Sequence, residues 1–425
     1  MRFRIQLLAA AVTAFGFTLV QAQDWPQWRG LGRDAKVEGF KAPSTWPKEL
    51  TKKWSVKVGD GVATPSLVGD KLFVYSREGG NEILRCLNAA DGKEIWQSKY
   101  EVGGATGPAQ GFAGPRGTPA VADGKVVTLG VRGMVSCHEA NTGKKLWSKD
   151  DYRGNYPMFF TSCSPIIVDS LAIVQLGGGD RSDGDGAIVA YDLASGAQKW
   201  KWSEDGTAYS SPILVTVEGT KQLVTETASR VVGISIADGK LLWSASFALQ
   251  GRSYNAATPM ASGQTVYYSG ASRGTFAAKI EKSGDKFTVK ELWKNPETTV
   301  QYNSPVLKDG LMFGLSDRNS LFCIHAETGK TTWTAPAPQP APAGGGGKGK
   351  GMRMGGGYGS IVDAGSVLVG LTPAGRLIVF QPTDKEYKEV ANYKVAESGT
   401  YAYPVLSGNR IFVKDRDSVT LWTID

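Results

Sequence analysis

The stretch TPAVADGKVVTLGVRGMVSCHEANTGKKLW, residues 118–147, decides the fold because near-copies of it recur along the chain. Two turn signals, Asp123-Gly124 and Asn141-Thr142-Gly143, divide it into short apolar runs. Glycine supplies the positive φ that tight hairpins need. We therefore expect three hairpin-linked strands, TPAVA, KVVTLGV and MVSCHEA, followed by a fourth, KKLW, whose Trp147 can seal one unit against the next.

Six clear copies of this unit begin with Thr-Pro or Ser-Pro and end at Trp. They cover residues 64–96, 118–147, 164–200, 211–243, 258–293 and 304–333. A seventh copy starts at Ser360 and has Tyr393 in the place of Trp, and an eighth starts at Tyr403 and stops one strand short. The unit starts lie 43 to 56 residues apart. A period in that range, with four strands per unit, is typical of propeller blades.

The missing strand of the eighth unit is found near the other end of the chain. Residues 50–58, LTKKWSVKV, resemble a fourth strand and have no first three strands before them. The sequence therefore predicts an all-β fold over residues 50–425: an eight-bladed β-propeller of four-stranded antiparallel blades. Its ring is closed by pairing of this N-terminal strand with the C-terminal blade, around residues 411–422. An open β-solenoid and several sandwiches are the alternatives, and the orphan strand argues against both.

The first 22 residues have the features of a secretory signal peptide. Arg2 and Arg4 precede an apolar run from Leu7 to Val20, and the segment ends in Val-Gln-Ala, a small-x-small cleavage pattern. We expect a periplasmic or secreted bacterial protein. No Cys follows the apolar run and no later run approaches membrane-spanning length. A lipid anchor and a transmembrane segment are therefore not expected.

Two segments fall outside the repeat pattern. Residues 23–49 predict an extended lead-in, with Trp25, Trp28 and Trp46 packed over a blade edge; ligand stacking is the alternative role for these indoles. Residues 334–359 are rich first in Pro and Ala and then in Gly and Lys. This composition predicts a disordered insertion on the rim, with a basic arm that touches anionic surfaces as the functional alternative.

The charge of the chain points away from nucleic acid. The formal net charge is +8, and +6 once Arg2 and Arg4 leave with the signal peptide. Basic residues are interspersed with acidic ones and form no Lys/Arg-rich run. We expect a soluble protein, most simply a monomer, that does not bind nucleic acid.

Groups able to do acid–base, nucleophilic or metal chemistry are few. The two histidines, His138 and His325, lie in or at the ends of third strands, which excludes a multi-histidine metal site. Neither lies near a sharp strand-to-helix turn that carries a nucleophile, so a Ser-His-Asp triad is not supported. The loop at 177–186 gathers three carboxylates, Asp180, Asp183 and Asp185, but its spacing does not match a calcium-binding EF-hand loop. A solvated hairpin tip is the simpler interpretation.

The four cysteines are explained by packing. Cys86, Cys137 and Cys323 occupy one repeat position, which neighbouring units fill with Ala190 or Gly233. A small buried side chain therefore suits this position. Exported proteins can keep disulfides, and Cys137 with Cys163, in adjacent blades, is the least implausible pair.

One set of polar and aromatic residues is defined by its position in the repeat. Residues immediately before each first strand should lie at one mouth of the central channel. They are Arg116, Ser162, Tyr209, Tyr254, Asn255, Gln301, Tyr302, Asn303, Tyr358 and Tyr401. Tyrosines and amides combine flat apolar area with hydrogen-bonding tips, which suits an extended peptide, a sugar or a planar ligand. The alternative is that these side chains only plug the channel.

The repeat resembles a known family. The pattern TP-x-V-x-DGK-x3-LG-x2-G-x3-C-x2-A-x-TGKKLW, repeated in DLASGAQKW, SIADGKLLW and HAETGKTTW, is similar to the pyrroloquinoline-quinone-type β-propeller repeat. The opening DWPQWRG and the GPRGTP of residues 114–119 further resemble its exported bacterial, quinoprotein-like members.

The resemblance implies two functional branches. In quinone-dependent alcohol and glucose dehydrogenases, the cofactor stacks between a Trp and a vicinal disulfide over the channel, with calcium held by carboxylates and amides. The other branch is similar to the non-enzymatic propeller lipoprotein of outer-membrane β-barrel assembly. This chain has no adjacent cysteines, no Trp among the predicted mouth residues and no lipid-attachment Cys. We expect a binding or scaffolding propeller without cofactor; an oxidoreductase with pyrroloquinoline quinone (PQQ) and calcium is the alternative.

Overall fold

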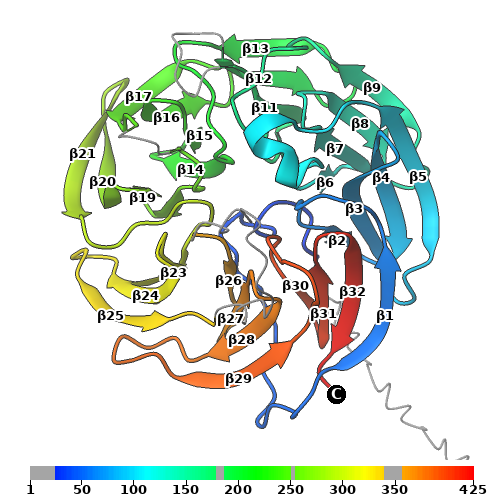
Figure 1. Ribbon diagram of the computed structural model, residues 1–425. Helices are drawn as coiled ribbons and strands as arrows, with labels where there is room; N and C mark the ends of the chain where they lie inside the picture. The colour runs from blue at the N-terminus through cyan, green and yellow to red at the C-terminus, as the bar shows by residue number, and fades with distance from the viewer. Residues whose placement is uncertain (1–23, 179–185, 250–253, 339–356) are drawn as a thin grey trace, which may run out of the picture.

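The computed structural model describes residues 24–178, 186–249, 254–338 and 357–425. Within these residues the strands form eight four-stranded antiparallel sheets arranged as the blades of a ring (Figure 1). The same residues include one short 3-10 helix, η1 (Gly107–Phe112). None of their helices is long and apolar enough to cross a membrane. The predicted eight-bladed all-β propeller is confirmed.

Seven blades are built from strands that are consecutive in the chain, and they are numbered here in chain order. Blade 1 contains β2 (Ser66–Val68), β3 (Lys71–Glu78), β4 (Asn81–Asn88) and β5 (Glu94–Glu101), and blade 2 contains β6 (Ala120–Ala122), β7 (Lys125–Leu129), β8 (Val135–Glu139) and β9 (Lys145–Lys149). Blade 3 contains β10 (Ile166–Val168), β11 (Leu171–Gly177), β12 (Gly186–Asp192) and β13 (Gln198–Trp202). Blade 4 contains β14 (Ile213–Val217), β15 (Thr220–Glu226), β16 (Arg230–Ser235) and β17 (Leu241–Ser246). Blade 5 contains β18 (Met260–Ser262), β19 (Thr265–Gly270), β20 (Gly274–Ser283) and β21 (Lys286–Asn295). Blade 6 contains β22 (Val306–Lys308), β23 (Leu311–Leu315), β24 (Ser320–His325) and β25 (Thr331–Pro336). Blade 7 contains β26 (Ser360–Asp363), β27 (Leu368–Thr372), β28 (Arg376–Phe380) and β29 (Glu389–Lys394).

The eighth blade closes the ring. It joins β30 (Val405–Ser407), β31 (Arg410–Lys414) and β32 (Ser418–Thr423) to β1 (Thr51–Lys57), the strand from the other end of the chain. β1 runs antiparallel to β32, with Thr51 opposite Thr423 and Lys57 opposite Ser418. The buried Lys414 Nζ adds hydrogen bonds to the carbonyls of Gly59 (3.4 Å) and Gly61 (3.0 Å), just beyond β1. The predicted closure is confirmed.

In most blades the tryptophan of the outer strand binds to the next blade through a specific contact. Its indole Nε1 donates to a backbone carbonyl beside the turn that connects the third and fourth strands of that blade. The pairs are Trp54–Ala89, Trp96–Ala140, Trp147–Leu193, Trp200–Ile236 and Trp293–Ala326, at 2.9 to 3.3 Å. The indole ring covers the turn glycine: a Cβ on Gly143 would lie 2.4 Å from Trp96. Trp54 makes this contact from β1 to blade 1, so the closing strand also locks the last interface.

The contact between blades 4 and 5 departs from this pattern. Trp243 donates to Gln222 Oε1 of its own blade at 2.6 Å. In blade 5 the last two strands are extended to ten residues each, which moves their turn away from the neighbouring indole. At the other irregular position, Tyr393 replaces Trp in blade 7 and its hydroxyl donates to the Pro47 carbonyl at 2.7 Å.

The cysteine positions follow from the same tryptophans. Cys86, Cys137 and Cys323 are the cross-strand partners of Trp96, Trp147 and Trp333, where only a small side chain leaves room for the indole. All four cysteines are buried and free, so the Cys137–Cys163 disulfide is not formed.

Part of the expected insertion is ordered. Thr334 to Pro336 continue β25, and Gly357 accepts hydrogen bonds from the backbone of Tyr302 (3.2 Å) and from Asn303 Nδ2 (2.8 Å). The expectation of disorder over 334–359 is wrong at both ends of the segment. Its middle part, 339–356, lies outside the described residues, as do the predicted signal peptide and the candidate loop with Asp180, Asp183 and Asp185.

The glycine beneath each indole gives a direct test of the interblade contact. Gly143 and Gly124 both have positive φ, +72° and +69°, but a Cβ at Gly124 would meet nothing within 4 Å. Gly124→Ala should cost about 1 kcal/mol of unfolding free energy, from backbone strain alone. Gly143→Ala should cost about 2 to 4 kcal/mol, because the methyl group also displaces Trp96. Chemical denaturation measures both, and equal costs would contradict the role given to the indole.

Candidate functional site

The segments that lead into the first strands meet at one mouth of the channel. Hydroxyl groups of the Thr-Pro and Ser-Pro motifs hold them at fixed spacing, because they accept backbone N–H groups of the preceding blade. Examples are Thr118 N to Ser164 Oγ (3.0 Å), Ser164 N to Ser211 Oγ (2.9 Å), Thr258 N to Ser304 Oγ (2.8 Å) and, across the closure, Tyr403 N to Thr64 Oγ1 (3.0 Å). This belt explains why Ser or Thr precedes proline in the repeats. It also directs the residues before it toward the mouth.

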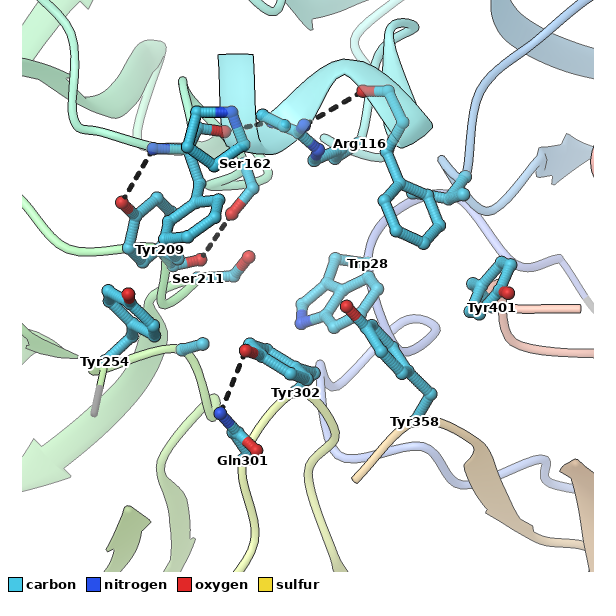
Figure 2. Close-up of a pocket in the computed structure, with 16 residues that line it drawn as sticks. Trp28, Arg116, Ser162, Tyr209, Ser211, Tyr254, Gln301, Tyr302, Tyr358 and Tyr401 are labelled. Carbon is cyan, nitrogen blue, oxygen red and sulfur yellow. Dashed lines mark hydrogen bonds between the residues drawn. The ribbon is translucent and has the colours of Figure 1, made fainter. Parts of the chain in front are cut away.

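A pocket of about 360 Å³ lies at this mouth. Each of the eight leading segments contributes to its wall, and the N-terminal segment supplies one residue more. The lining residues are Trp28, Val62, Pro108, Ala109, Phe112, Arg116, Phe159, Ser162, Tyr209, Ser211, Tyr254, Ala256, Gln301, Tyr302, Tyr358 and Tyr401 (Figure 2).

Most of the predicted mouth residues lie around this pocket. Arg116, Ser162, Tyr209, Tyr254, Gln301, Tyr302, Tyr358 and Tyr401 line it. Asn255 and Asn303 do not. Both are buried, and their Nδ2 groups donate to backbone carbonyls, of Thr227 at 2.7 Å and of Leu315 at 2.8 Å. These two amides support loops, and the prediction that Asn255 faces a ligand is wrong.

The aromatic rings form two clusters on opposite sides of the pocket (Figure 2). In one cluster Phe159 packs edge-on against Tyr254 at 4.9 Å and against Tyr209 at 6.3 Å. In the other, Tyr302 stacks on Tyr358 at 4.6 Å, and Phe112 and Tyr401 pack edge-on to each other at 5.0 Å. Such mutual packing fixes the ring positions before a ligand arrives, which lowers the entropic cost of binding.

Three aromatic residues of the site lie outside the set that the repeat position placed at the mouth, although ligand stacking was the alternative role given to Trp28. Phe112 ends η1, and Phe159 lies in the loop before blade 3, so both are several residues upstream of their first strands. The sequence rule considered only the residues immediately before each strand. The Pro-containing runs GPAQGF, which ends at Phe112, and YPMFF, which contains Phe159, were the sequence features that could have indicated these two residues. Trp28, the third, comes from the lead-in.

The lead-in passes through the centre of the ring (Figure 1). Trp25 forms an isolated β-bridge with Leu67 of β2, as expected for packing at a blade edge. Lys36, where the lead-in leaves the centre, forms another with Asp363 of β26. Between them residues 27–34 form turns, so this part is not extended. Trp28 lines the pocket, donates from Nε1 to Thr258 Oγ1 (2.8 Å) and packs edge-on against Tyr403 (5.0 Å). The sequence-based statement that no Trp lies at the mouth is wrong.

Two buried arginines fix this central plug, residues 24–37. Arg33 donates to the carbonyls of Pro212 (2.5 Å), Pro165 (2.9 Å) and Ser164 (3.2 Å), and Arg29 to that of Pro305 (2.6 Å). The inner edges of the blades carry carbonyl groups without a strand partner, and these guanidinium groups satisfy them. Burial lowers the pKa of Arg33 to about 9, so the side chain is still charged at neutral pH. The plug thus joins blades 3, 4 and 6.

Arg116 holds the two loops that carry the unpredicted phenylalanines. Its guanidinium donates to the carbonyls of Phe159 and, at 2.9 Å, Phe112. Burial lowers the pKa of Arg116, and negative charge nearby acts against this. The side chain therefore shapes both aromatic clusters and places a positive charge in the wall.

The geometry defines a class of protein: an eight-bladed propeller whose channel is plugged and whose mouth forms an aromatic pocket. The sequence profile of the family described as outer membrane protein assembly factor BamB matches residues 33–182 and 80–335. The chain belongs to this family.

Individual relatives are distant. A quinohemoprotein alcohol dehydrogenase of Comamonas testosteroni is 25% identical over 200 residues, which are 44% of this chain and 27% of the relative. The outer membrane protein assembly factor BamB of Burkholderia pseudomallei is 26% identical over 169 residues, 40% of each chain. The matched region is thus less than half of either relative.

Solved structures show the same fold. The crystal structure of BamB from Moraxella catarrhalis superposes with a TM-score of 0.61 and 15% identity, over 88% of this chain and 99% of that one. The quinohemoprotein alcohol dehydrogenase of Comamonas testosteroni gives a TM-score of 0.68 and 14% identity, over 94% and 80%. At these identities the likeness concerns the fold alone.

The importance of the plug can be measured with Arg33→Met. Loss of the guanidinium leaves three carbonyl oxygens without a donor, and we expect a cost of about 2 to 3 kcal/mol in unfolding free energy. Arg153→Met is the matched control, because the Arg153 side chain is 85% exposed and should change stability by less than about 0.5 kcal/mol. Denaturant unfolding of both variants measures the two changes in unfolding free energy. Indistinguishable midpoints would show that the plug does not support the ring.

Proposed function

We propose that this protein is a non-catalytic exported propeller that binds a ligand or partner protein in the pocket at the channel mouth. The observation that carries the proposal is the lining of that pocket, with preformed aromatic clusters from seven separate segments. Tyr, Trp and Arg are the residues most enriched at energetically important contacts. Concave, mostly apolar pockets with a few polar tips are the usual form of ligand sites.

The chemistry of the lining favours binding over catalysis. Among the described residues, no Asp, Glu, His, Cys or Lys lines the pocket. General acid–base catalysis mostly uses these side chains, and a serine nucleophile such as Ser162 or Ser211 needs one of them as its base. Both histidines lie in third strands, His138 in β8 and His325 in β24, and neither lines the pocket.

A quinone-linked dehydrogenase is the second candidate, and Trp28 is the observation in its favour. The family resemblance implies a cofactor stacked on a Trp over the channel, and an indole is present at the base of the pocket with a guanidinium in the wall. The remaining donors do not fit PQQ with calcium. The lining has no carboxylate, and the described residues contain no group of three His, Cys, Asp or Glu able to hold a metal.

The cellular setting is part of the proposal. Residues 1–22 would act as a cleaved signal peptide and deliver a monomer to the periplasm or beyond. Either a small molecule or a partner protein would bind at the mouth lined by Tyr302 and Tyr358.

Dye-linked dehydrogenase assays separate the two candidates. The purified chain is incubated with PQQ and calcium and then assayed with primary alcohols and glucose by reduction of an artificial electron acceptor. The proposal predicts no reduction above that of the Trp28→Ala variant. Saturable activity in the wild-type protein, lost in that variant, would overturn it in favour of the dehydrogenase.

The pocket itself is tested by Tyr302→Ala, with Tyr152→Ala as a half-buried control outside the pocket. Native mass spectrometry of protein purified from its own cells reports any retained molecule. Tyr302→Ala should weaken retention by about 1 to 3 kcal/mol, roughly 5- to 150-fold, while the melting temperature stays near that of the control. A wild-type protein that retains nothing, or retention that is equal in the two variants, would contradict a binding role for the mouth.

A further inference from the structure

Three guanidinium groups surround or underlie the pocket, and each is hydrogen-bonded to neutral oxygens. Arg116 lies in the wall, and Arg29 and Arg33 belong to the plug whose Trp28 forms the base. Within the described part of the chain, none of the three forms an ion pair. The positive charge of this region is therefore not cancelled by a direct partner.

Arg29 lies in the plug behind the Trp28 base of the pocket and does not line the pocket itself. Arg29 is fully buried and lies over the ring of Tyr403 at 5.7 Å, and the same ring packs edge-on against Trp28. Among the described residues, the Nε and Nη1 atoms of Arg29 have no hydrogen-bond acceptor. Burial lowers the pKa of Arg33, and the positive charge of Arg29 lowers it further.

The nearby carboxylates are already engaged. Asp60 accepts from the backbone N–H of Gly114 at 3.1 Å and faces Arg416 at 3.8 Å. Glu82 accepts hydrogen bonds from the hydroxyls of Tyr75 and Tyr100 and from the Val131 N–H. Burial raises the pKa of Glu82, which favours its neutral form. Both act on Arg116 only through space. Neither lines the pocket.

We infer that the pocket selects an organic anion with a flat apolar body of about two rings, and that Arg116 determines this charge specificity. The inference rests on the proposed binding function. The apolar body fits between the two aromatic clusters, and the anionic group, a carboxylate, sulfonate or phosphate, is attracted by guanidinium charge in a poorly hydrated recess. The lining offers no carboxylate to hold a bridging divalent cation, so this anion is bound without one.

The inference is tested with 2-naphthoate and 2-naphthamide, which have the same shape and differ in charge. Isothermal titration calorimetry of the full chain should give one site per chain, with naphthoate bound at least about tenfold more tightly than naphthamide at low salt. The preference should shrink at about 0.5 M salt, where charges are screened over a few ångströms. Chelation with EDTA should leave it unchanged.

Variants at Arg116 separate charge from shape. Arg116→Gln should reduce the naphthoate preference several-fold, Arg116→Lys should keep most of it because the charge remains, and the exposed Arg153→Gln should change nothing. Equal affinity for both probes, or a preference that survives Arg116→Gln and high salt, would overturn the anion specificity while leaving the pocket as a binding site. If neither probe binds, and Tyr302→Ala has no effect on retained molecules, the proposed function itself fails.

Discussion

Five of the interfaces between blades depend on the contact between one blade's tryptophan and the next blade's glycine turn. A four-stranded sheet cannot bury both faces alone, so each blade is stable only beside its neighbours. The indole supplies apolar area and one directed hydrogen bond, and the glycine leaves the space for it. Because Trp54 makes this contact from β1, the two ends of the chain are fastened at the same interface. Closure of the ring then fixes the starts of all eight first strands around one opening.

The site is a consequence of that closure. Since every first strand begins at the same face, the eight preceding segments converge, and residues distant in the sequence become neighbours. An open channel would leave their carbonyls to water. Arg29 and Arg33 occupy it instead and turn the opening into a blind pocket with Trp28 at its base. Arg116, in the wall, gives the pocket its positive charge.

The sequence predicted what is repeated and missed what occurs once. Blade boundaries, strand order and the closing strand follow from turn glycines and terminal tryptophans that recur at a fixed period. Tyr209, Tyr254 and Tyr302 were found by their place in the repeat. Trp28 and Phe159 lie in unique segments without periodicity, and Asn255 was misassigned because a loop backbone, invisible in the sequence, needed its amide. The buried arginines could not be foreseen, because their acceptors are carbonyls from blades more than a hundred residues away.

We have proposed that the plugged mouth is a preformed site for an organic anion, and a crystal structure of the full chain soaked with 2-naphthoate would test this. We expect the naphthyl rings between the two aromatic clusters above Trp28, the carboxylate directed at Arg116 and an unmoved plug. Naphthoate bound elsewhere, or seated in the pocket with its carboxylate turned away from Arg116 and the plug displaced, would contradict it.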